Sequence, residues 1–559
     1  MVKWVVGAVA LCLAATSVSA DVFPIGAGTE GRRWLQEAPT AENPIKRYPI
    51  TLEDGVIVTA RDGVKLEGRL FRPTLASSEK ATPCVLMTDG YGRASNTGAS
   101  FDGPLFDIAS RGYAVLHLSL RGSGKSEGKA DLYAHFGEDG YDAVEWMAAQ
   151  PWCDGRVGMV GPSLLGISQW LAAKEAPPHL KAIVPEVACG DCYGELWYPG
   201  GMRPGPGREA RKSSPGAEAE YATAIAHPDF DAWWKARTTL ADAAAAIGKR
   251  RVAVFVAGGQ DDYISPANLR LYTQLGADAR KRLFFGPYAH GWHIGLIQEL
   301  QVQWLDRWLK DEANGADAGA RVMIYIKGAN RWRSEADWPL PDAHQTRLFL
   351  SGQRSGSAQS VNDGSLTVRK ASAGEAVQVT YSPEAGPFLP VLLSATKGRS
   401  VLDQRAIEAK VATWTTEPLA AATEVTGYPR VSLWASATAP DADLVVSLND
   451  VAPDGTSRQV MQGYLNARHA KDLQAAPTAI TPGELRRYDL ELFPVAYVFG
   501  AGHRMRLAIA GGAEPPAGLP FPQGPGKNPT ANTWAIATDP EHAATLDLPV
   551  IGTGWQELR

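Results

Sequence analysis

Apolar runs alternate with helical patterns over the first half of the chain, and this alternation limits the fold more than any other feature. Runs typical of buried strands occur at 84–87, 113–118, 157–160, 180–184, 252–257 and 282–285. Helical patterns occur at 141–149, 167–176 and 297–308. Strands that alternate with helices form a mostly parallel sheet with helices on both faces. The pattern predicts an α/β domain over 21–192 and 249–312, with a strand hairpin at 55–72 near its start.

Two segments depart from this alternation. Residues 193–248 combine a Gly/Pro stretch with Ala-rich helical sequence between two predicted strands, which predicts an inserted helical cap. A small, polar segment at 313–320 reads as a linker. Beyond it, short strand patterns between Gly, Pro and Asp turns predict an all-β sandwich or jelly roll over 321–559. These patterns lie at 322–326, 346–350, 444–448, 487–492 and 504–509.

The segment 157–166 joins a predicted strand to a predicted helix through Gly161-Pro162-Ser163-Leu164-Leu165-Gly166. A sharp strand-to-helix turn is where an α/β-hydrolase exposes its nucleophilic serine above the sheet. The spacing here is G-x-S-x-x-G rather than G-x-S-x-G. Ser163 is the candidate nucleophile, and the alternative is an ordinary small residue in a tight turn.

An acid and a histidine follow Ser163 in the chain order of an α/β-hydrolase triad. Asp261 comes after the strand pattern 252–257, and His290 comes after 282–285. The carboxyl ends of parallel strands meet at one sheet edge, where active-site loops gather. His290 would take the serine proton, and Asp261 would orient the imidazole. Asp262 and His293 are the respective alternatives.

Several motifs together resemble the CocE/NonD hydrolases, the group of cocaine esterase, α-amino-acid ester hydrolases and X-Pro dipeptidyl-peptidases. They are the Ser163 turn with Ser168-Gln169-Trp170 after it, GGQDD at 258–262, GPYAH at 286–290, RGYAVLHLSLRGSGKSEG at 111–128, PWCDGRVGMVG at 151–161, HPDFDAWW at 227–234 and AGHRMRLAI at 501–509. The resemblance spans nearly all of the chain after residue 20. It implies an α/β fold: a hydrolase core, an inserted helical cap and a C-terminal all-β jelly roll.

The resemblance also implies an oxyanion hole and a substrate class. The matching donors are the hydroxyl of Tyr91 and the backbone N–H of Leu164. Amino-acid ester hydrolases carry acidic residues two and three positions after the triad aspartate, and counted from Asp261 these positions are Tyr263 and Ile264. Tyr263 instead suits an apolar or aromatic acyl group. Trp170, Trp197 and Tyr198 are further pocket candidates, although aromatic residues are more often simply packed in a core.

The leading hypothesis is a serine hydrolase that cleaves carboxylic esters, with amides as a second substrate class, through an acyl-enzyme on Ser163. One rival is an X-Pro dipeptidyl-peptidase or β-lactam acylase, for which Glu186, Asp191 or Glu195 would have to anchor a substrate amine near Ser163. Another rival is a carbohydrate-binding protein with an inactive hydrolase core.

Composition and charge exclude other classes. The 559 residues are 45% hydrophobic and 21% charged with a net charge of −5, which is not typical of a disordered chain. A pI near 6.1 without a long basic run argues against nucleic-acid binding. No metal-ligand spacing or phosphate loop is present in the sequence, so neither a metal nor a cofactor is expected. The expected partner is a small-molecule ester or amide, and a homodimer or homotetramer is left open.

The N-terminus has the pattern of a targeting segment. Lys3, the apolar run 5–15 and the small residues Val18-Ser19-Ala20 form the pattern of a secretory signal peptide over 1–20, cleaved before Asp21. The mature protein is therefore expected to be secreted or periplasmic, with no membrane attachment after cleavage.

Four cysteines remain after such cleavage: Cys84, Cys153, Cys189 and Cys192. Four cysteines allow three full pairings, and an oxidising compartment permits them. The Cys189-Gly190-Asp191-Cys192 segment fits a local structural disulfide or two free thiols better than redox chemistry.

Overall fold

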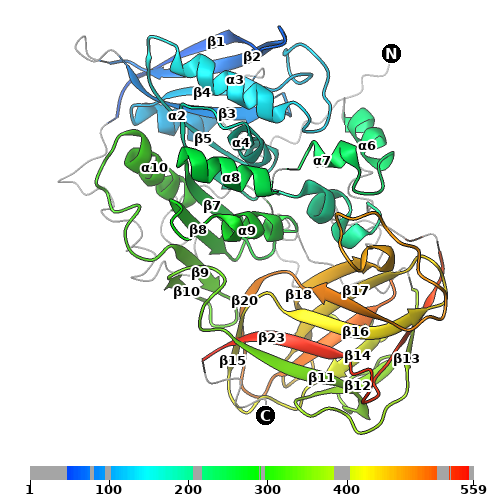
Figure 1. Cartoon of the computed structure of the whole chain (residues 1–559). Helices are drawn as coiled ribbons and strands as arrows, with labels where there is room; N and C mark the ends of the chain where they lie inside the picture. The colour runs from blue at the N-terminus through cyan, green and yellow to red at the C-terminus, as the bar shows by residue number, and fades with distance from the viewer. Residues whose placement is uncertain are drawn as a thin grey trace, which may run out of the picture.

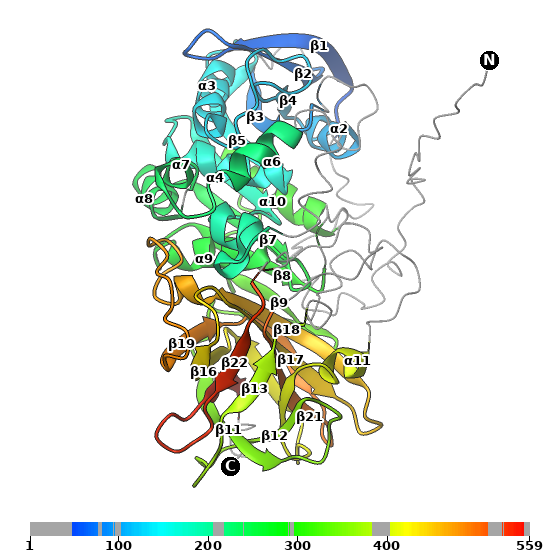
Figure 2. The ribbon, with the colours of Figure 1, turned by 90° about the vertical axis from the view of Figure 1, so that its right-hand side faces the viewer.

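The structure, a computed structural model, describes residues 47–75, 81–92, 94, 102–204, 217–238, 240–288, 290, 296–382, 403–512, 528 and 530–552. The signal-peptide pattern at 1–20 and the alternative histidine His293 lie outside these residues. Among the described residues, no helix has the length and apolar character needed to cross a membrane. The chain forms an α/β domain and an all-β domain, stacked one above the other in Figures 1 and 2.

The α/β domain is built on a ten-stranded sheet with the order β1-β2-β4-β3-β5-β6-β7-β8-β9-β10. Strands β3 to β9 run parallel to their neighbours within that group, while β1, β2 and β10 pair antiparallel. The strands are β1 (Ile50–Thr59), β2 (Lys65–Pro73), β3 (Thr82–Asp89), β4 (Ala114–Ser119), β5 (Cys153–Pro162), β6 (Leu180–Glu186), β7 (Ala253–Gly259), β8 (Lys281–Gly286), β9 (Val322–Ile326) and β10 (Arg331–Glu335).

Both faces of this sheet are buried. Successive side chains of a strand point to opposite faces, so one strand contributes to two apolar cores. In β7, Val254 and Val256 face one apolar core, whereas Ala253, Phe255 and Ala257 face another. Residues of α3 (Phe136–Ala148), α4 (Leu164–Lys174), α8 (Leu240–Arg250) and α9 (Ser265–Gln274) pack into the first core. Residues of α2 (Asp102–Ser110) and α10 (Leu296–Leu309) pack into the second.

The segment inserted between β6 and β7 carries short helices, and in Figure 1 these lie beside the α/β domain and above the all-β domain. These helices are η3 (Tyr193–Trp197), η4 (Pro199–Gly201), α6 (Ala217–Ile225) and α7 (Ala232–Lys235). The predicted insertion of 193–248 is too long, because α8 within that range packs against α4 and α9 of the α/β domain. The insertion itself reaches the all-β domain, where η4 contacts β18 (Ser457–Asn466) and η8 (Ala467–His469).

The predicted all-β domain over 321–559 starts with two strands, β9 and β10, that extend the first sheet. Strand β9 pairs in parallel with β8 through Leu283 and Val322, and β10 pairs with β9, so both strands extend the first sheet. The segment 313–320 is accordingly a loop within the α/β domain rather than a linker between domains. All five residues of β9 are buried apolar residues, a pattern that fits a strand in either sheet. The sequence alone therefore could not assign its partner.

The second domain is all-β, as predicted, and its assignment as a jelly roll stays a prediction. Its remaining elements are β11 (His344–Arg354), β12 (Asn362–Thr367), β13 (Val377–Thr380), α11 (Arg405–Glu408), β14 (Ala412–Thr415), β15 (Thr423–Gly427), β16 (Arg430–Ala437), β17 (Asp443–Val451), β19 (Arg486–Glu491), β20 (Val495–Phe499), β21 (Arg504–Ala510), β22 (Thr533–Ile536) and β23 (Thr545–Ile551). A separate apolar core, with Trp414, Trp534 and Phe499 among its members, fills this domain.

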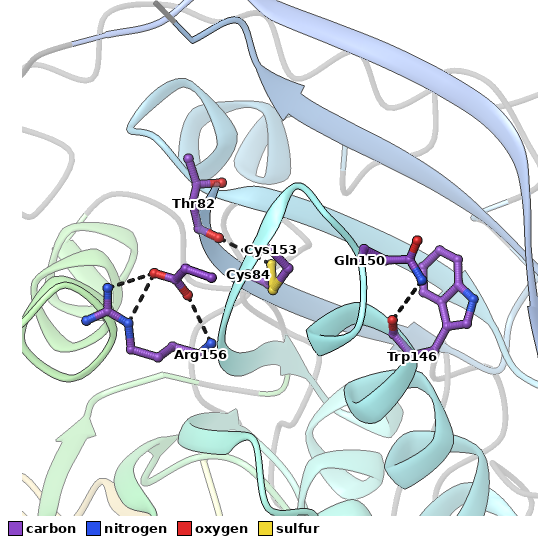
Figure 3. Close-up of a disulfide and its surroundings, with 7 residues drawn as sticks. Thr82, Cys84, Trp146, Gln150, Cys153 and Arg156 are labelled. Atoms are coloured by element: carbon purple, nitrogen blue, oxygen red, sulfur yellow. Dashed lines mark hydrogen bonds and ion pairs between the residues drawn. A yellow bond between two sulfur atoms is a disulfide. The ribbon is translucent and has the colours of Figure 1, made fainter. Parts of the chain in front are cut away.

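The cysteines pair as Cys84–Cys153 and Cys189–Cys192. The first disulfide joins the starts of β3 and β5, which also pair through Thr82 and Cys153 (Figure 3). The second closes the loop that leads from β6 into the insertion. Both pairs are buried, so these cysteines are structural in this arrangement.

We expect the first disulfide to contribute more stability than the second, because it closes the longer loop. The sequence separations are 69 and 3 residues, for which loop-closure entropy corresponds to about 4 and about 2 kcal/mol. The double variant Cys84→Ser/Cys153→Ser should therefore unfold at clearly lower urea concentration than Cys189→Ser/Cys192→Ser, measured by tryptophan fluorescence. Equal midpoints for the two double variants would contradict this expectation.

Candidate active site

The turn between β5 and α4 has the geometry of a nucleophile elbow. Ser163 has φ 58° and ψ −124°, a backbone conformation that is strained for residues other than glycine. Its N–H donates to the backbone oxygen of Glu186 at 2.8 Å, which ties the turn to the end of β6. Its carbonyl oxygen accepts from Gly166 and Ile167, which starts α4. The serine side chain therefore stands at the carboxyl edge of the sheet.

Two glycines make this turn sterically possible. Gly161 has φ 136°, and a Cβ there would lie 2.6 Å from the Cβ of Leu165. A Cβ on Gly166 would lie 2.7 Å from the Cβ of Ala188. These distances are below normal contact, so G-x-S-x-x-G is the spacing that lets the helix pack directly behind the strand.

Ser163, His290 and Asp262 form a hydrogen-bonded chain. The Nε2 atom of His290 lies 2.8 Å from the Oγ of Ser163. The Nδ1 atom of His290 lies 3.2 Å from each carboxylate oxygen of Asp262. Asp262 is almost fully buried, at 1% exposure. A buried carboxylate on one imidazole nitrogen and a hydroxyl on the other is the arrangement that activates a serine for nucleophilic attack.

The prediction of Asp261 as the acid is corrected by this geometry. The carboxylate of Asp261 accepts from the Nζ atom of Lys327 at 2.6 Å. The two adjacent aspartates thus have different partners, and Asp262 is the one beside the imidazole. The GGQDD motif does not distinguish them, because the choice depends on a lysine 66 residues further along the chain.

The two predicted oxyanion donors come from segments that lie against each other. Leu164 is the first residue of α4, and N–H groups in the first turn of a helix have no partner within it. A Cβ on Gly90 would lie 2.7 Å from a methyl carbon of Leu164, so the loop that carries Tyr91 packs on this residue. The buried carboxylate of Asp89 holds that loop, since it accepts from the N–H groups of Tyr91 at 2.7 Å and Ala94 at 3.2 Å.

The pocket candidates divide into two groups. Tyr263 packs against the catalytic histidine candidate, with 5.1 Å between the ring centroids of Tyr263 and His290. Trp170 has no exposed surface and donates its Nε1–H to Asn268 at 3.2 Å, so it is a core residue and the prediction that it lines the pocket is wrong. Trp197 and Tyr198 each expose only 3% and join an aromatic cluster in the insertion.

Three carboxylates at the entrance to the insertion are buried within the protein. Asp191 accepts from the N–H groups of Tyr193 and Gly194 and from the side chain of Gln474. Glu195 pairs with Arg270, and burial raises the pKa of Glu195 to about 8 although the arginine opposes this shift. The side chain of Glu186 is buried, at 1% exposure. None of the three presents an open carboxylate as an anchor for a substrate amine.

The argument against an amino-acid ester substrate also holds when the two positions are counted from Asp262 instead of Asp261. The positions two and three residues after Asp262 are Ile264 and Ser265, and neither is acidic.

Among the described residues, no group of three or more His, Cys, Asp or Glu side chains is arranged to hold a metal ion.

Comparison with known proteins agrees with the fold. Residues 62–212 and 206–292 match the sequence family described as X-Pro dipeptidyl-peptidase (S15 family). Residues 314–547 match the family described as X-Pro dipeptidyl-peptidase C-terminal non-catalytic domain. The chain is 28% identical over 529 residues to cocaine esterase from Rhodococcus sp. (strain MB1 Bresler), covering 82% of this chain and 90% of that protein.

Two solved structures share the whole architecture. A CocE/NonD family hydrolase from Staphylococcus aureus superposes with a TM-score of 0.73 at 21% identity, covering 90% of this chain and 94% of its own. An α-amino acid ester hydrolase superposes with a TM-score of 0.70 at 19% identity, covering 90% of this chain and 96% of its own. At these identities the likeness concerns the fold.

The two adjacent aspartates offer a matched test of the site. We expect Asp262→Asn to lower kcat for p-nitrophenyl ester hydrolysis by about 1,000- to 10,000-fold, because an amide cannot hold the imidazole in its working tautomer. Asp261→Asn should cost less than about tenfold, because it changes a partly exposed ion pair that does not contact His290. Steady-state kinetics of both variants decide the question. A larger loss in Asp261→Asn would return the acid role to that residue.

Proposed function

Because this chain belongs to the CocE/NonD family of serine hydrolases, we propose that it hydrolyses carboxylic esters with Ser163 as nucleophile, His290 as general base and Asp262 as the supporting acid. The observation that carries the proposal is the continuous chain of contacts through His290: 2.8 Å to the Oγ of Ser163 and 3.2 Å to Asp262. The strained backbone of Ser163 supports the same assignment, since such strain gathers at functional sites.

The reaction would proceed through an acyl-enzyme. The Oγ of Ser163 attacks the ester carbonyl carbon while Nε2 of His290 takes its proton. The oxyanion that forms is bound by the N–H of Leu164 and the hydroxyl of Tyr91, and one such donor is typically worth about 3–4 kcal/mol. His290 then gives the proton to the departing alkoxide, so the alcohol leaves and the acyl group stays on Ser163. Water attacks the acyl-enzyme by the same route and releases the carboxylic acid.

An apolar or aromatic acyl group fits this site better than one with a free amine. Tyr263 lies beside the imidazole, and Leu164 contributes an apolar side chain next to the serine. A cationic amine would need a nearby carboxylate, yet Asp191 and Glu195 are already bound to protein groups. The similarity to a cocaine esterase is in line with an ester substrate.

Secretion is part of the proposal. The pattern at 1–20 has the three regions of a signal peptide. Two buried disulfides fit an oxidising compartment, where such bonds persist. These two features together support the proposed location.

The X-Pro dipeptidyl-peptidase reading is the second candidate, because the matched catalytic family carries that description. It predicts preference for a substrate with a free N-terminal amine and a proline amide, such as Ala-Pro-p-nitroanilide. A carbohydrate-binding protein without catalysis predicts no turnover and no covalent labelling of a serine.

We expect p-nitrophenyl acyl esters to be hydrolysed and the p-nitroanilides of the same acyl groups to be hydrolysed far more slowly. Ser163→Ala should lose ester turnover by about a millionfold, as is typical when a triad nucleophile is removed. Initial rates at 405 nm for the mature protein and for Ser163→Ala measure both quantities. Labelling with a fluorophosphonate probe should occur in the wild type and be absent in Ser163→Ala.

The outcomes separate the candidates. Preference for Ala-Pro-p-nitroanilide over the esters would favour the peptidase. Ester turnover that persists in Ser163→Ala would refute the nucleophile assignment. An unlabelled, inactive wild type would favour the binding protein.

A further inference from the structure

The loop 260–264 between β7 and α9 carries both aspartates and is called the acid loop here. Gln260, the residue before the two aspartates, binds it to the all-β domain. The side chain of Gln260 is buried and makes two hydrogen bonds to backbone groups. Its Nε2 donates to the carbonyl oxygen of Tyr325 in β9 at 2.5 Å, and its Oε1 accepts from the N–H of Ala496 in β20 at 3.0 Å. One side chain thus connects the acid loop, the edge of the first sheet and the second domain.

The next residue is fastened at the same place. The Nζ atom of Lys327 lies 2.6 Å from Asp261, and the lysine backbone is itself bound to β20. Its N–H donates to Ala496 at 2.9 Å, and its carbonyl oxygen accepts from Val498 at 2.8 Å. Strands β9 and β20 contact each other where the two domains meet (Figure 1). The backbone of Lys327 is therefore fixed by β20, and its ammonium group reaches Asp261 from this fixed position.

The acid loop is also held on its other side, by the loop that carries the histidine. The N–H of Asp261 donates to the carbonyl oxygen of Tyr288 at 3.0 Å. A Cβ on Gly259 would lie 2.1 Å from that same oxygen, so the two loops are in direct backbone contact. Asp262 is left with its carboxylate on His290 and on the N–H of Ile264.

We propose that Lys327 and Gln260 are positioning residues, through which β20 of the all-β domain turns Asp261 away from His290 and leaves Asp262 facing it. Two adjacent carboxylates compete for one imidazole, because either negative charge would stabilise its protonated form. Lys327 removes one competitor by pairing with it. The inference rests on the proposed function, because it concerns the acid of that triad. It also gives a role in positioning to the domain that matches a family described as non-catalytic.

The central test is a double-variant cycle on Lys327 and Asp261. Lys327→Met leaves the Asp261 carboxylate without its cation, so we expect kcat for the best p-nitrophenyl ester to fall about fivefold with KM unchanged. Lys327→Arg keeps the charge and should retain most of kcat. In Lys327→Met/Asp261→Asn the competing charge is gone, so kcat should recover toward the wild-type value.

Lys310→Met is the matched control. Lys310 also pairs with an aspartate, Asp306, at 2.6 Å and with similar side-chain exposure, but it directly follows α10 and holds no active-site loop. It should leave kcat unchanged. Gln260→Ala is the second arm: it leaves the buried Ala496 N–H without a partner, and we expect about a tenfold loss of kcat with little change in KM.

A kcat for Lys327→Met equal to that of Lys310→Met would overturn the proposal, and so would a loss that the added Asp261→Asn does not restore. If Lys327→Met does not fold, Gln260→Ala decides alone, and a wild-type kcat in that variant overturns the proposal. Failure of the proposed function would look different: Ser163→Ala would remain active, or the wild type would be inactive on every ester.

Discussion

The positive φ of 58° at Ser163 is held by packing rather than by local preference, and the catalytic geometry depends on it. A side chain in this region costs of order 1–3 kcal/mol unless the surroundings impose it. Here β6 binds the serine N–H through Glu186, and the close approaches at Gly161 and Gly166 leave the helix no other position. The strain directs the Oγ out of the sheet edge, where His290 from the loop after β8 can reach it. We expect a change that lets the turn relax to lengthen the contact between Ser163 and His290.

The other half of the site is not self-contained in the same way. The elbow is built from β5, α4 and β6, which are neighbours in sequence and in space. The acid loop, by contrast, owes its direction to β9 and β20, because Gln260 and Asp261 are bound there. The proposed nucleophile is thus held by elements of one domain, and the loop of its proposed acid is bound where the two domains meet. We infer that separating the domains would disorganise the acid while leaving the serine turn intact.

This difference explains what the sequence could and could not predict. Buried parallel strands have apolar sequences, so β3 to β8 could be predicted from the sequence. The nucleophile elbow could be predicted as well, because the tight turn itself needs glycines at 161 and 166. His290 followed from chain order. Asp262 was not separable from Asp261, since the partner that distinguishes them, Lys327, is remote in sequence. The same limit applies to β9, whose apolar residues fit either sheet, and to Trp170, which is buried in the core and donates to Asn268 of α9. Patterns with local causes were predicted, and choices made by tertiary partners were not.

The carboxylates near the insertion follow the same logic and bear on substrate choice. Glu195 on η3 pairs with Arg270 of α9, which also reaches Glu491 of β19, so the group joins the insertion to both domains. Burial raises the pKa of Asp191 as well, and Gln474 of the all-β domain binds it. A buried acid that is already paired cannot attract a substrate ammonium without first losing its partner, and breaking a buried pair typically costs about 3–5 kcal/mol. In this chain Asp191 and Glu195, which might have recognised an amine, instead join the insertion to the rest of the protein, and this supports the proposed preference for neutral esters.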